Sequence, residues 1–338
     1  MRRFLLVALV PIMLTPAAPA TASTAVTKTP IAFEVVNPQD PAATWTIRGH
    51  VYTADGCSPT SALLLLHGLS YGQWGWDFPI DPDTYSVARA LARAGYAVVA
   101  IDELGYDTSG GDSDPEGRQL NGYQVTVGSY ADMTAQIVDD LRGSGFTEVG
   151  LVGHSAGTEI SELTAAIHRN VDVVVATAYH HFPSQRIVAD FLTGDVVRAA
   201  FDDYEYFGED AAQRAEYMYN LDVARPDVVA QDTALANLTP SGEVWSIAGQ
   251  PSGKVLQAID VPVLLVLAEA DLLFPPTSDY DGESDNGSNE LALFAASPDK
   301  ELHVVPDAGH SFMLHPNAPD TNDVIASWLT DGRLTDTC

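Results

Sequence analysis

Five continuous runs of apolar residues restrict the fold of this chain more than any other feature. They lie at Ala62–Leu66, Tyr96–Ile101, Glu148–Val152, Val171–Thr177 and Val261–Ala268. A strand that is apolar at nearly every position must be covered on both faces, which is typical of a parallel sheet between two layers of helices. Helical patterns separate the runs, at Thr84–Ala94, Tyr130–Arg142 and Ala156–His168. We therefore predict an α/β fold with a mostly parallel central sheet and helices on both faces.

The alternation of strands and helices is interrupted once. It begins with strand patterns at Ile31–Val36 and Trp45–Tyr52, which suggest a hairpin, and it resumes late with a helix at Glu290–Ala296, a strand at Glu301–Val305 and a helix at Thr321–Leu329. From about residue 182 to 256 the chain is instead acidic, aromatic and helical, with stretches at Asp202–Phe207 and Glu209–Asn220. An interruption followed by resumption predicts a helical cap inserted into one domain.

The first 22 residues have the pattern of a secretory signal peptide. Met1, Arg2 and Arg3 form a basic start, an apolar run of 11 residues follows at Phe4–Leu14, and small residues at 18–22 offer a cleavage site. The alternative is an uncleaved anchor, but a membrane-spanning helix needs about 20 apolar residues. We expect a signal peptide at 1–22, one domain at 23–338, a secreted location and no membrane span in the mature protein.

Charge limits the partners of the chain. Sixteen Lys and Arg residues stand against 46 Asp and Glu residues, for a net charge of −30. Nucleic-acid binding depends on a basic face, so we expect no nucleic-acid partner.

The acidic loop at 277–290 has acidic residues at some of the positions that bind calcium in a calcium-binding loop, but Ser284 stands where such a loop needs glycine. A solvated acidic loop is the favoured interpretation, with calcium left open.

The chain has two cysteines, Cys57 and Cys338. In an oxidising compartment such a pair favours a disulfide, here between an early loop and the C-terminal residue. Two unpaired, partly buried thiols are the alternative.

The pentapeptide Gly153-His154-Ser155-Ala156-Gly157 directly follows one predicted core strand and precedes a predicted helix. This is the context that the G-x-S-x-G nucleophile turn requires, because the glycines permit a tight turn that exposes the serine hydroxyl near a helix N-terminus. Ser155 is thus a candidate nucleophile. The competing role is an ordinary helix N-cap.

A serine nucleophile needs a base and an acid, and both follow later predicted strands. His310 comes after the last apolar strand and Asp271 after the penultimate one. His303, His315 and Glu269 are the neighbouring rivals. His303 falls inside a predicted strand and His315 in a stretch bounded by proline, which favours His310.

The order Ser155, Asp271, His310 resembles that of the α/β-hydrolase superfamily, and the chain is similar to a secreted serine esterase or lipase of that group. The resemblance places the acid at Asp271 rather than at Glu269. It includes His67-Gly68-Leu69, similar to the HG oxyanion loop, and implies that the N–H groups of Leu69 and Ala156 form the oxyanion hole. Residues 102–109 (DELGYDTS) resemble the D-x-x-G-x-G-x-S loop, with Asp107 in place of the second glycine, so the local turn geometry stays open.

Aromatic residues near these motifs are candidates for a substrate pocket. Tyr71, Trp74 and Trp76 follow the oxyanion loop, and His180 and His181 follow a core strand at the same sheet edge. Burial in the core is the competing role for the aromatics. The adjacent histidines are weak evidence for zinc, because no Cys or close acid accompanies them in the sequence.

The resemblance implies a serine hydrolase that cleaves a carboxylic ester, with an apolar or aromatic group, through an acyl-enzyme, and that needs no metal or organic cofactor. An amidase, peptidase, lactonase or C–C hydrolase would use the same triad. An epoxide hydrolase is disfavoured, since the resemblance would demand Asp where Ser155 stands. An inactive binding protein on the same fold is the alternative from another class. Oligomeric state is left open.

Overall fold

The computed structural model describes residues 25–193, 205–247 and 254–335. Its main sheet has eight strands in the order β1-β2-β4-β3-β5-β6-β9-β10. The strands are β1 Val26–Val36, β2 Thr44–Ala54, β3 Ser61–Leu66, β4 Ala97–Ile101, β5 Glu148–His154, β6 Val173–Thr177, β9 Val263–Ala268 and β10 Lys300–Val305. β2 runs antiparallel to β1 and β4, and the other neighbours are parallel. The predicted α/β class and mostly parallel sheet are confirmed.

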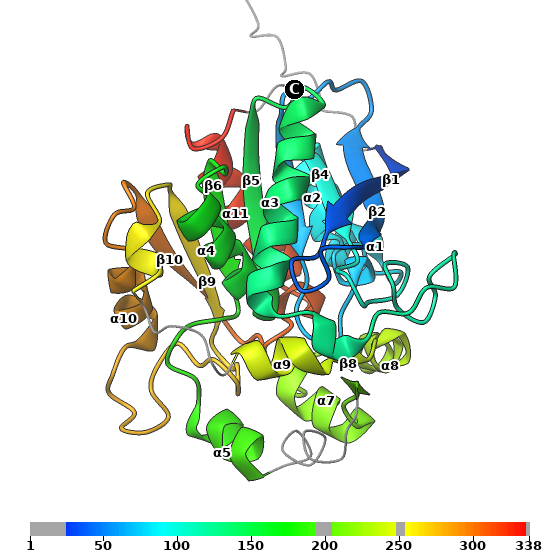
Figure 1. Ribbon diagram of the computed structural model, residues 1–338. Coiled ribbons are helices and arrows are strands. Elements are labelled where there is room, and N and C mark those ends of the chain that lie inside the picture. Colours follow the sequence, from blue (N-terminus) through cyan, green and yellow to red (C-terminus); the bar gives the residue numbers. More distant parts are fainter. Residues whose placement is uncertain (1–24, 194–204, 248–253, 336–338) are drawn as a thin grey trace, which may run out of the picture.

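Helices cover both faces of the sheet. They are α1 Pro82–Tyr85, α2 Val87–Arg93, α3 Val127–Gly143, α4 Ala156–His168, α10 Asn286–Leu293 and α11 Ala318–Thr330. Figure 1 shows α3 and α4 in front of the sheet and α2 and α11 behind it. Alternate side chains of β3 separate accordingly: Leu63 and Leu65 pack with α2 and α11, whereas Leu64 and Leu66 pack with α3 and α4. This two-sided burial explains the continuous apolar runs.

Helical segments and one short pair of strands lie between β6 and β9. They are α5 Gln185–Thr193, β7 Tyr206–Phe207, α7 Ala211–Met218, α8 Pro226–Leu235, β8 Thr239–Pro240 and α9 Ser241–Ile247. β7 and β8 pair antiparallel. The helices gather beyond one end of the main sheet (Figure 1). Residues of α7 and α9 line the same cavity as Ser155, so this is the end at which the parallel strands finish.

Two predicted helices differ from those observed. The helix expected at Thr84–Ala94 is broken at Ser86, whose extended backbone (φ −117°, ψ 99°) separates α1 from α2 and whose hydroxyl caps α2 by accepting from the N–H of Arg89. The helix expected at Glu290–Ala296 begins four residues earlier, because Asp285 caps it through the N–H of Ser288. In both places a local side-chain cap decides the boundary.

The stretch 202–207 was expected to be helical. Residues 202–204 lie outside the described residues, and Tyr206 and Phe207 form strand β7 against Thr239 and Pro240 of β8. That partner strand lies more than 30 residues away in the sequence, so a local pattern could not reveal it. Single-turn 3₁₀ helices occur at Gln73–Gly75, Gly122–Gln124, Leu256–Ala258 and Phe312–Leu314.

Three predictions concern the ends of the chain. The predicted signal peptide at 1–22 and Cys338 lie outside the described residues. Among the helices that the structure describes, none is both long and apolar enough to cross a membrane.

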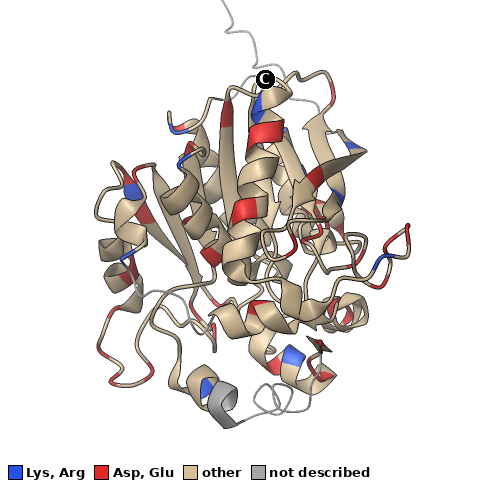
Figure 2. Cartoon of the chain, viewed as in Figure 1, with Lys and Arg blue, Asp and Glu red and all other residues tan. Residues whose placement is uncertain are grey.

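Acidic residues far outnumber basic ones over the described chain, as Figure 2 shows.

Candidate active site

Ser155 lies in a tight turn between β5 and α4. Its backbone is left-handed in φ (54°, with ψ −121°), a conformation that a residue with a side chain rarely adopts. The turn is crowded: a Cβ on Gly153 would lie 2.3 Å from the carbonyl oxygen of Gly157, and a Cβ on Gly157 would lie 2.2 Å from that of Leu66 in β3. Glycine is therefore required at both positions for steric reasons.

The side chain of Ser155 does not cap α4. The residue occupies the N-cap position, yet its hydroxyl accepts no capping hydrogen bond from the helix. Ser155 instead lines a cavity together with Ala156, the first residue of α4. At a helix N-terminus the first N–H groups have no acceptor within the helix, so that of Ala156 is available to a ligand.

Two threonines hold this turn in place, and sequence reasoning missed both. The carbonyl oxygen of Thr177, at the end of β6, accepts from the N–H of Ser155 at 2.8 Å and from the hydroxyl of Thr158 at 2.8 Å. The hydroxyl of Thr158 in turn accepts from the N–H of Thr177 at 2.8 Å. These bonds tie α4 to β6 and help to stabilise the strained backbone of Ser155.

His310 and Asp271 form a buried pair. Nδ1 of His310 donates to Oδ2 of Asp271 at 2.8 Å. The other oxygen of Asp271 accepts from the N–H groups of Leu273 at 2.8 Å and Phe274 at 3.1 Å, which orients the carboxylate. With Nδ1 engaged, Nε2 of His310 is the ring atom available to accept a proton.

The rival residues have other roles. Nε2 of His315 accepts from the N–H groups of Gly309 and Asn220, at 3.0 and 3.1 Å, so it braces the loop that carries His310. His303 lies half-buried on β10. Glu269 is exposed and accepts from the N–H of Asp307 at 3.0 Å.

A cavity of about 400 Å³ brings these groups together. Ser155, His310, Leu69 and Ala156 all line it. Most of the remaining wall is apolar. The segments between β6 and β9 contribute Tyr179, Ile187, Phe207, Tyr217, Met218, Val244 and Ile247, and the loop after β9 contributes Leu273 and Phe274. Glu209, Asp210 and Gln213 supply a polar section.

Of the five predicted pocket residues, Tyr71 alone is among the described residues that line this cavity. Trp74 stacks on Tyr71 with ring centroids 5.0 Å apart, and Trp76 is buried edge-on against His154. His180 is buried and hydrogen-bonds the carbonyl oxygen of Pro275 at 2.9 Å, while His181 pairs with Glu290. Trp74, His181 and His180 pack behind the cavity wall, because their rings contact the lining residues Tyr71, Tyr179 and Phe274 respectively.

Buried histidines support the oxyanion loop. His67 donates from Nδ1 to the carbonyl oxygen of Gly68 at 2.9 Å, and its Nε2 accepts from the N–H of Glu103 at 3.1 Å. Burial lowers the pKa of His67 to about 4, so the ring is neutral in this role. Burial also holds the pKa of His154 well below its usual range, with the neighbouring His310 a smaller cause.

The oxyanion loop is fastened to the segments around it. Tyr71 shares a hydrogen bond with the hydroxyl of Ser311, the residue after His310. Ser70, beside Leu69, accepts from Nη1 of Arg214 on α7 at 2.5 Å. Arg214 also forms two bonds with Asp232 on α8, at 2.8 and 3.0 Å, and lies over the ring of Tyr71. Sequence patterns did not indicate this buried arginine.

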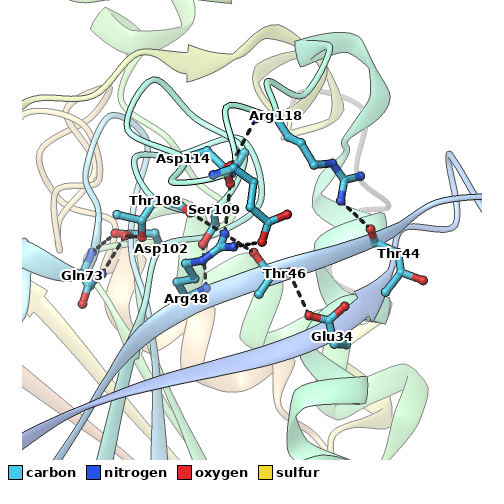
Figure 3. A network of polar contacts seen from close by, with 12 residues as sticks. Glu34, Thr44, Thr46, Arg48, Gln73, Asp102, Thr108, Ser109, Asp114 and Arg118 are labelled. Carbon is cyan, nitrogen blue, oxygen red and sulfur yellow. Dashed lines mark hydrogen bonds and ion pairs between the residues drawn. The ribbon is translucent and has the colours of Figure 1, made fainter.

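A polar network holds the loop after β4 (Figure 3). Asp102 accepts from the N–H and side-chain amide of Gln73 and, at 2.6 Å, from the hydroxyl of Thr108. Asp107, which replaces the expected glycine of this loop, has a φ of 35°. The chain thus keeps the left-handed conformation that glycine would adopt, at a position where Asp tolerates it better than most residues.

Comparisons with known proteins agree with the observed fold. A model of the Alpha/beta hydrolase family matches residues 63–319. The chain belongs to the alpha/beta hydrolase family. A thermophilic esterase from Thermogutta terrifontis has a similar fold, with a TM-score of 0.64 at 17% identity over 89% of this chain and 98% of the esterase. A monoacylglycerol lipase from Paleococcus ferrophilus has a TM-score of 0.57 at 20% identity, over 79% of this chain and 93% of the lipase.

This hydrolase also resembles a curated relative, Epoxide hydrolase 3 of Xenopus tropicalis. The two are 30% identical over 136 residues, which is 40% of this chain. The match spans about a third of the relative, 32% of its length. A match of this extent does not identify the bond that this chain cleaves, so we infer that bond from the residues of the site.

Proposed function

We propose that this hydrolase cleaves carboxylic esters through an acyl-enzyme on Ser155. The observation that carries the proposal is the buried Asp271–His310 pair opening into the same cavity as Ser155. Nucleophilic acyl transfer requires a nucleophile, a base that accepts its proton and an acid that orients the base.

The reaction follows from the role of each group. His310 accepts the proton of the Ser155 hydroxyl as the oxygen attacks the ester carbonyl, and Asp271 stabilises the resulting imidazolium. The N–H groups of Leu69 and Ala156 bind the oxyanion. His310 then donates its proton to the leaving alcohol. Water repeats the sequence on the acyl-enzyme, which releases the acid and restores Ser155.

The cavity supports an ester of moderate size with an uncharged, apolar group. Its volume of about 400 Å³ is at the lower end of the usual range for small-molecule sites, which begins at about 300 Å³. Aromatic and aliphatic side chains form most of the wall, and its charged members, Glu209 and Asp210, would repel a substrate carboxylate.

Epoxide opening is the second candidate, because of the curated relative. The chemistry of residue 155 argues against it. By the resemblance given above, an epoxide hydrolase requires an aspartate nucleophile, and this chain has serine in the turn.

We also propose that the protein is exported, on the basis of the residue pattern at 1–22.

Covalent labelling and ester turnover test the mechanism together. We expect a fluorophosphonate to modify Ser155, and aryl esters of graded acyl length to be hydrolysed with an optimum set by the cavity. Ser155→Ala and His310→Ala should each lower kcat by several orders of magnitude while the fold is retained by circular dichroism. Ester turnover by folded Ser155→Ala protein near the wild-type rate would contradict the mechanism. Turnover of a styrene oxide without ester cleavage would favour the epoxide alternative.

A further inference from the structure

A second cluster of polar side chains lies behind the wall of the catalytic cavity. Glu162 comes from the middle of α4, His181 from the loop after β6, and Glu290 from α10. Each side chain offers one atom that could bind a metal ion, and these three atoms lie within 4.8 Å of one another. Three segments that are far apart in the sequence thus direct two carboxylates and an imidazole to one point.

The cluster is buried, and one of its members lacks a partner. Glu290 is fully buried; it accepts from Nδ1 of His181 at 2.7 Å and from the N–H of His181 at 2.9 Å. Glu162 is 1% exposed, and neither of its carboxylate oxygens has a hydrogen-bond partner within the described part of the chain. A buried polar atom without a partner destabilises the folded state, and more so when it is charged. The environment of Glu162 is therefore incomplete.

Burial and neighbouring charge act in the same direction on Glu162. Burial raises its pKa well above the usual range, and the negative charge of Glu290 raises it further. Both effects arise because two carboxylates share one dry site. A bound cation would reverse both effects, since it would supply the missing partner and balance the charge.

We propose that Glu162, His181 and Glu290 bind one divalent transition-metal ion, with zinc the best match. Zinc is bound by imidazole nitrogen and carboxylate oxygen at about 2.0–2.2 Å, often with three protein ligands and a water. In a tetrahedral site two ligands at such distances are separated by about 3.4 Å, so Nδ1 of His181 and Oε1 of Glu290, which are 2.7 Å apart, would need to separate by less than about 1 Å to hold the ion. Two carboxylates and a neutral imidazole also carry the charge that balances the ion.

The same donor set excludes the common hard cations. Calcium takes about six to eight oxygen ligands, and magnesium keeps several waters and prefers carboxylates and phosphates. An imidazole in a buried set of three donors favours zinc over both. On binding, the proton that Nδ1 of His181 donates to Glu290 moves through solvent to Nε2 of the same ring, so that the neutral imidazole binds the ion through Nδ1. The proton that Glu162 holds is released to solvent.

The ion would have a structural role. α4 begins directly after Ser155, and the ring of His181 lies against Tyr179, which lines the cavity. Tyr179 packs on Phe274, and Phe274 packs on His310, with ring centroids 4.8 and 5.8 Å apart. Binding would therefore link the nucleophile helix, the cavity wall and α10, without contact with the substrate.

Metal titration of the whole protein tests this inference. The protein is dialysed against EDTA, freed of chelator and titrated with zinc, manganese or calcium chloride at neutral pH, by calorimetry and thermal melting. We expect one zinc ion per chain, a higher Tm with zinc, and binding at least about tenfold tighter for zinc than for manganese. Cobalt(II) in the same site should give visible absorption bands of a nitrogen and oxygen ligand set without thiolate.

The chain offers a matched control on the same helix. Glu159 is also buried and lies one turn before Glu162, outside the cluster. Glu162→Gln should abolish stoichiometric zinc binding and the zinc-dependent rise in Tm, whereas Glu159→Gln should retain both. His181→Gln is the second variant, for use if Glu162→Gln is not folded by circular dichroism.

Three results would overturn the inference. They are no stoichiometric zinc binding by the wild-type protein, equal zinc binding by the cluster variants, and calcium binding with no zinc binding. Each of them leaves the proposed ester chemistry intact, because fluorophosphonate labelling of Ser155 does not depend on this site.

Discussion

Glu243 is a carboxylic acid within the interior, beneath the loop after β4. It is fully buried, and one of its oxygens accepts from the hydroxyl of Tyr106 at 2.6 Å. Burial raises the pKa of Glu243 to about 8. The buried Glu103 nearby also has a pKa well above its usual range, through burial and then through the charge of Glu243. These two acids prefer the protonated form in the folded protein.

A raised pKa in the folded state makes stability depend on pH. The unfolded chain loses the Glu243 proton near the ordinary pKa of Glu, whereas the folded chain keeps it to about pH 8. Between these values the folded state binds more protons, so the free energy of unfolding falls as pH rises, by at most about 1.4 kcal/mol per pH unit for one group. We expect urea unfolding of Glu243→Gln to show a shallower decline from pH 5 to pH 8 than the wild type. Equal slopes would contradict this assignment.

The positions of the candidate catalytic residues follow from the strand pattern of the sequence. Ser155, Asp271 and His310 each follow a core strand, and parallel strands finish at one edge, so strand patterns place the three side chains near one another. Arg214, Thr158 and Thr177 escaped prediction because their partners are remote in the sequence. The buried acids escaped it too, since composition alone treats every Asp and Glu as exposed.

At the scale of elements, one buried arginine joins two cap helices to the oxyanion loop. Arg214 on α7 is 1% exposed; it binds the fully buried Asp232 on α8 and the hydroxyl of Ser70. Removing one partner of a buried pair leaves the other charge uncompensated, at a cost of about 3–5 kcal/mol. The same change removes the contact that positions Ser70 beside Leu69.

We therefore expect Arg214→Met to lower both stability and ester turnover. Unfolding by urea should show a loss of several kcal/mol, and kcat should fall more than KM rises, because the affected loop carries the proposed oxyanion donor. Arg225→Met is the control, since Arg225 forms an exposed pair with Asp227 in the same cap. It should leave the Tm unchanged. Equal losses of stability and turnover in the two variants would contradict the role that we assign to Arg214.

The elements of the core could be predicted, and those of the insertion only in outline. Apolar runs indicate the parallel strands β3, β4, β5, β6 and β9, because two-sided burial leaves a strong local pattern, whereas the edge strand β10 is only partly buried. The pairing of β7 with β8 and the break at Ser86 depend on a remote partner and on one side-chain cap. Neither contributes to hydrophobic periodicity, so neither was predicted.

At the scale of the whole molecule, the C-terminal segment returns to the start of β3. The hydroxyl of Ser61 donates to the carbonyl oxygen of Thr335 at 2.7 Å, and the N–H of Thr335 donates to Glu148 at 2.8 Å. Ser61 is four residues after Cys57, and Thr335 is three before Cys338, which lies outside the described residues. These contacts support the predicted disulfide.

We expect intact-mass analysis of the exported protein to find no free thiol until a reductant is added. The entropic model gives a stabilisation of about 5–6 kcal/mol for a bridge that closes so long a loop, and strain in the folded state would lower this value. The Tm should therefore fall on reduction, and in Cys57→Ser protein by the same amount. Two free thiols without reductant would contradict the pairing.

The net charge of −30 governs the last prediction. Only three lysines, Lys28, Lys254 and Lys300, stand among 46 acids, so carboxylates at the surface repel one another and oppose the compact state. Buried acids such as Glu243 and Glu162 do not add to this repulsion while they are protonated. Acidic residues are nevertheless spread over the described part of the chain, as Figure 2 shows. Salt shortens the Debye length from about 30 Å at 0.01 M to about 3 Å at 1 M and so screens the repulsion.

We expect the Tm to rise between 10 mM and 1 M NaCl at neutral pH. The rise should be smaller at pH 5, because partial protonation of carboxylates then removes part of the repulsion that salt would screen. Screening also weakens the exposed ion pairs, such as that of Arg93 with Asp83, which acts in the opposite direction. A Tm that is flat or falls across this range would mean that attraction within such pairs outweighs the repulsion among the unpaired acids.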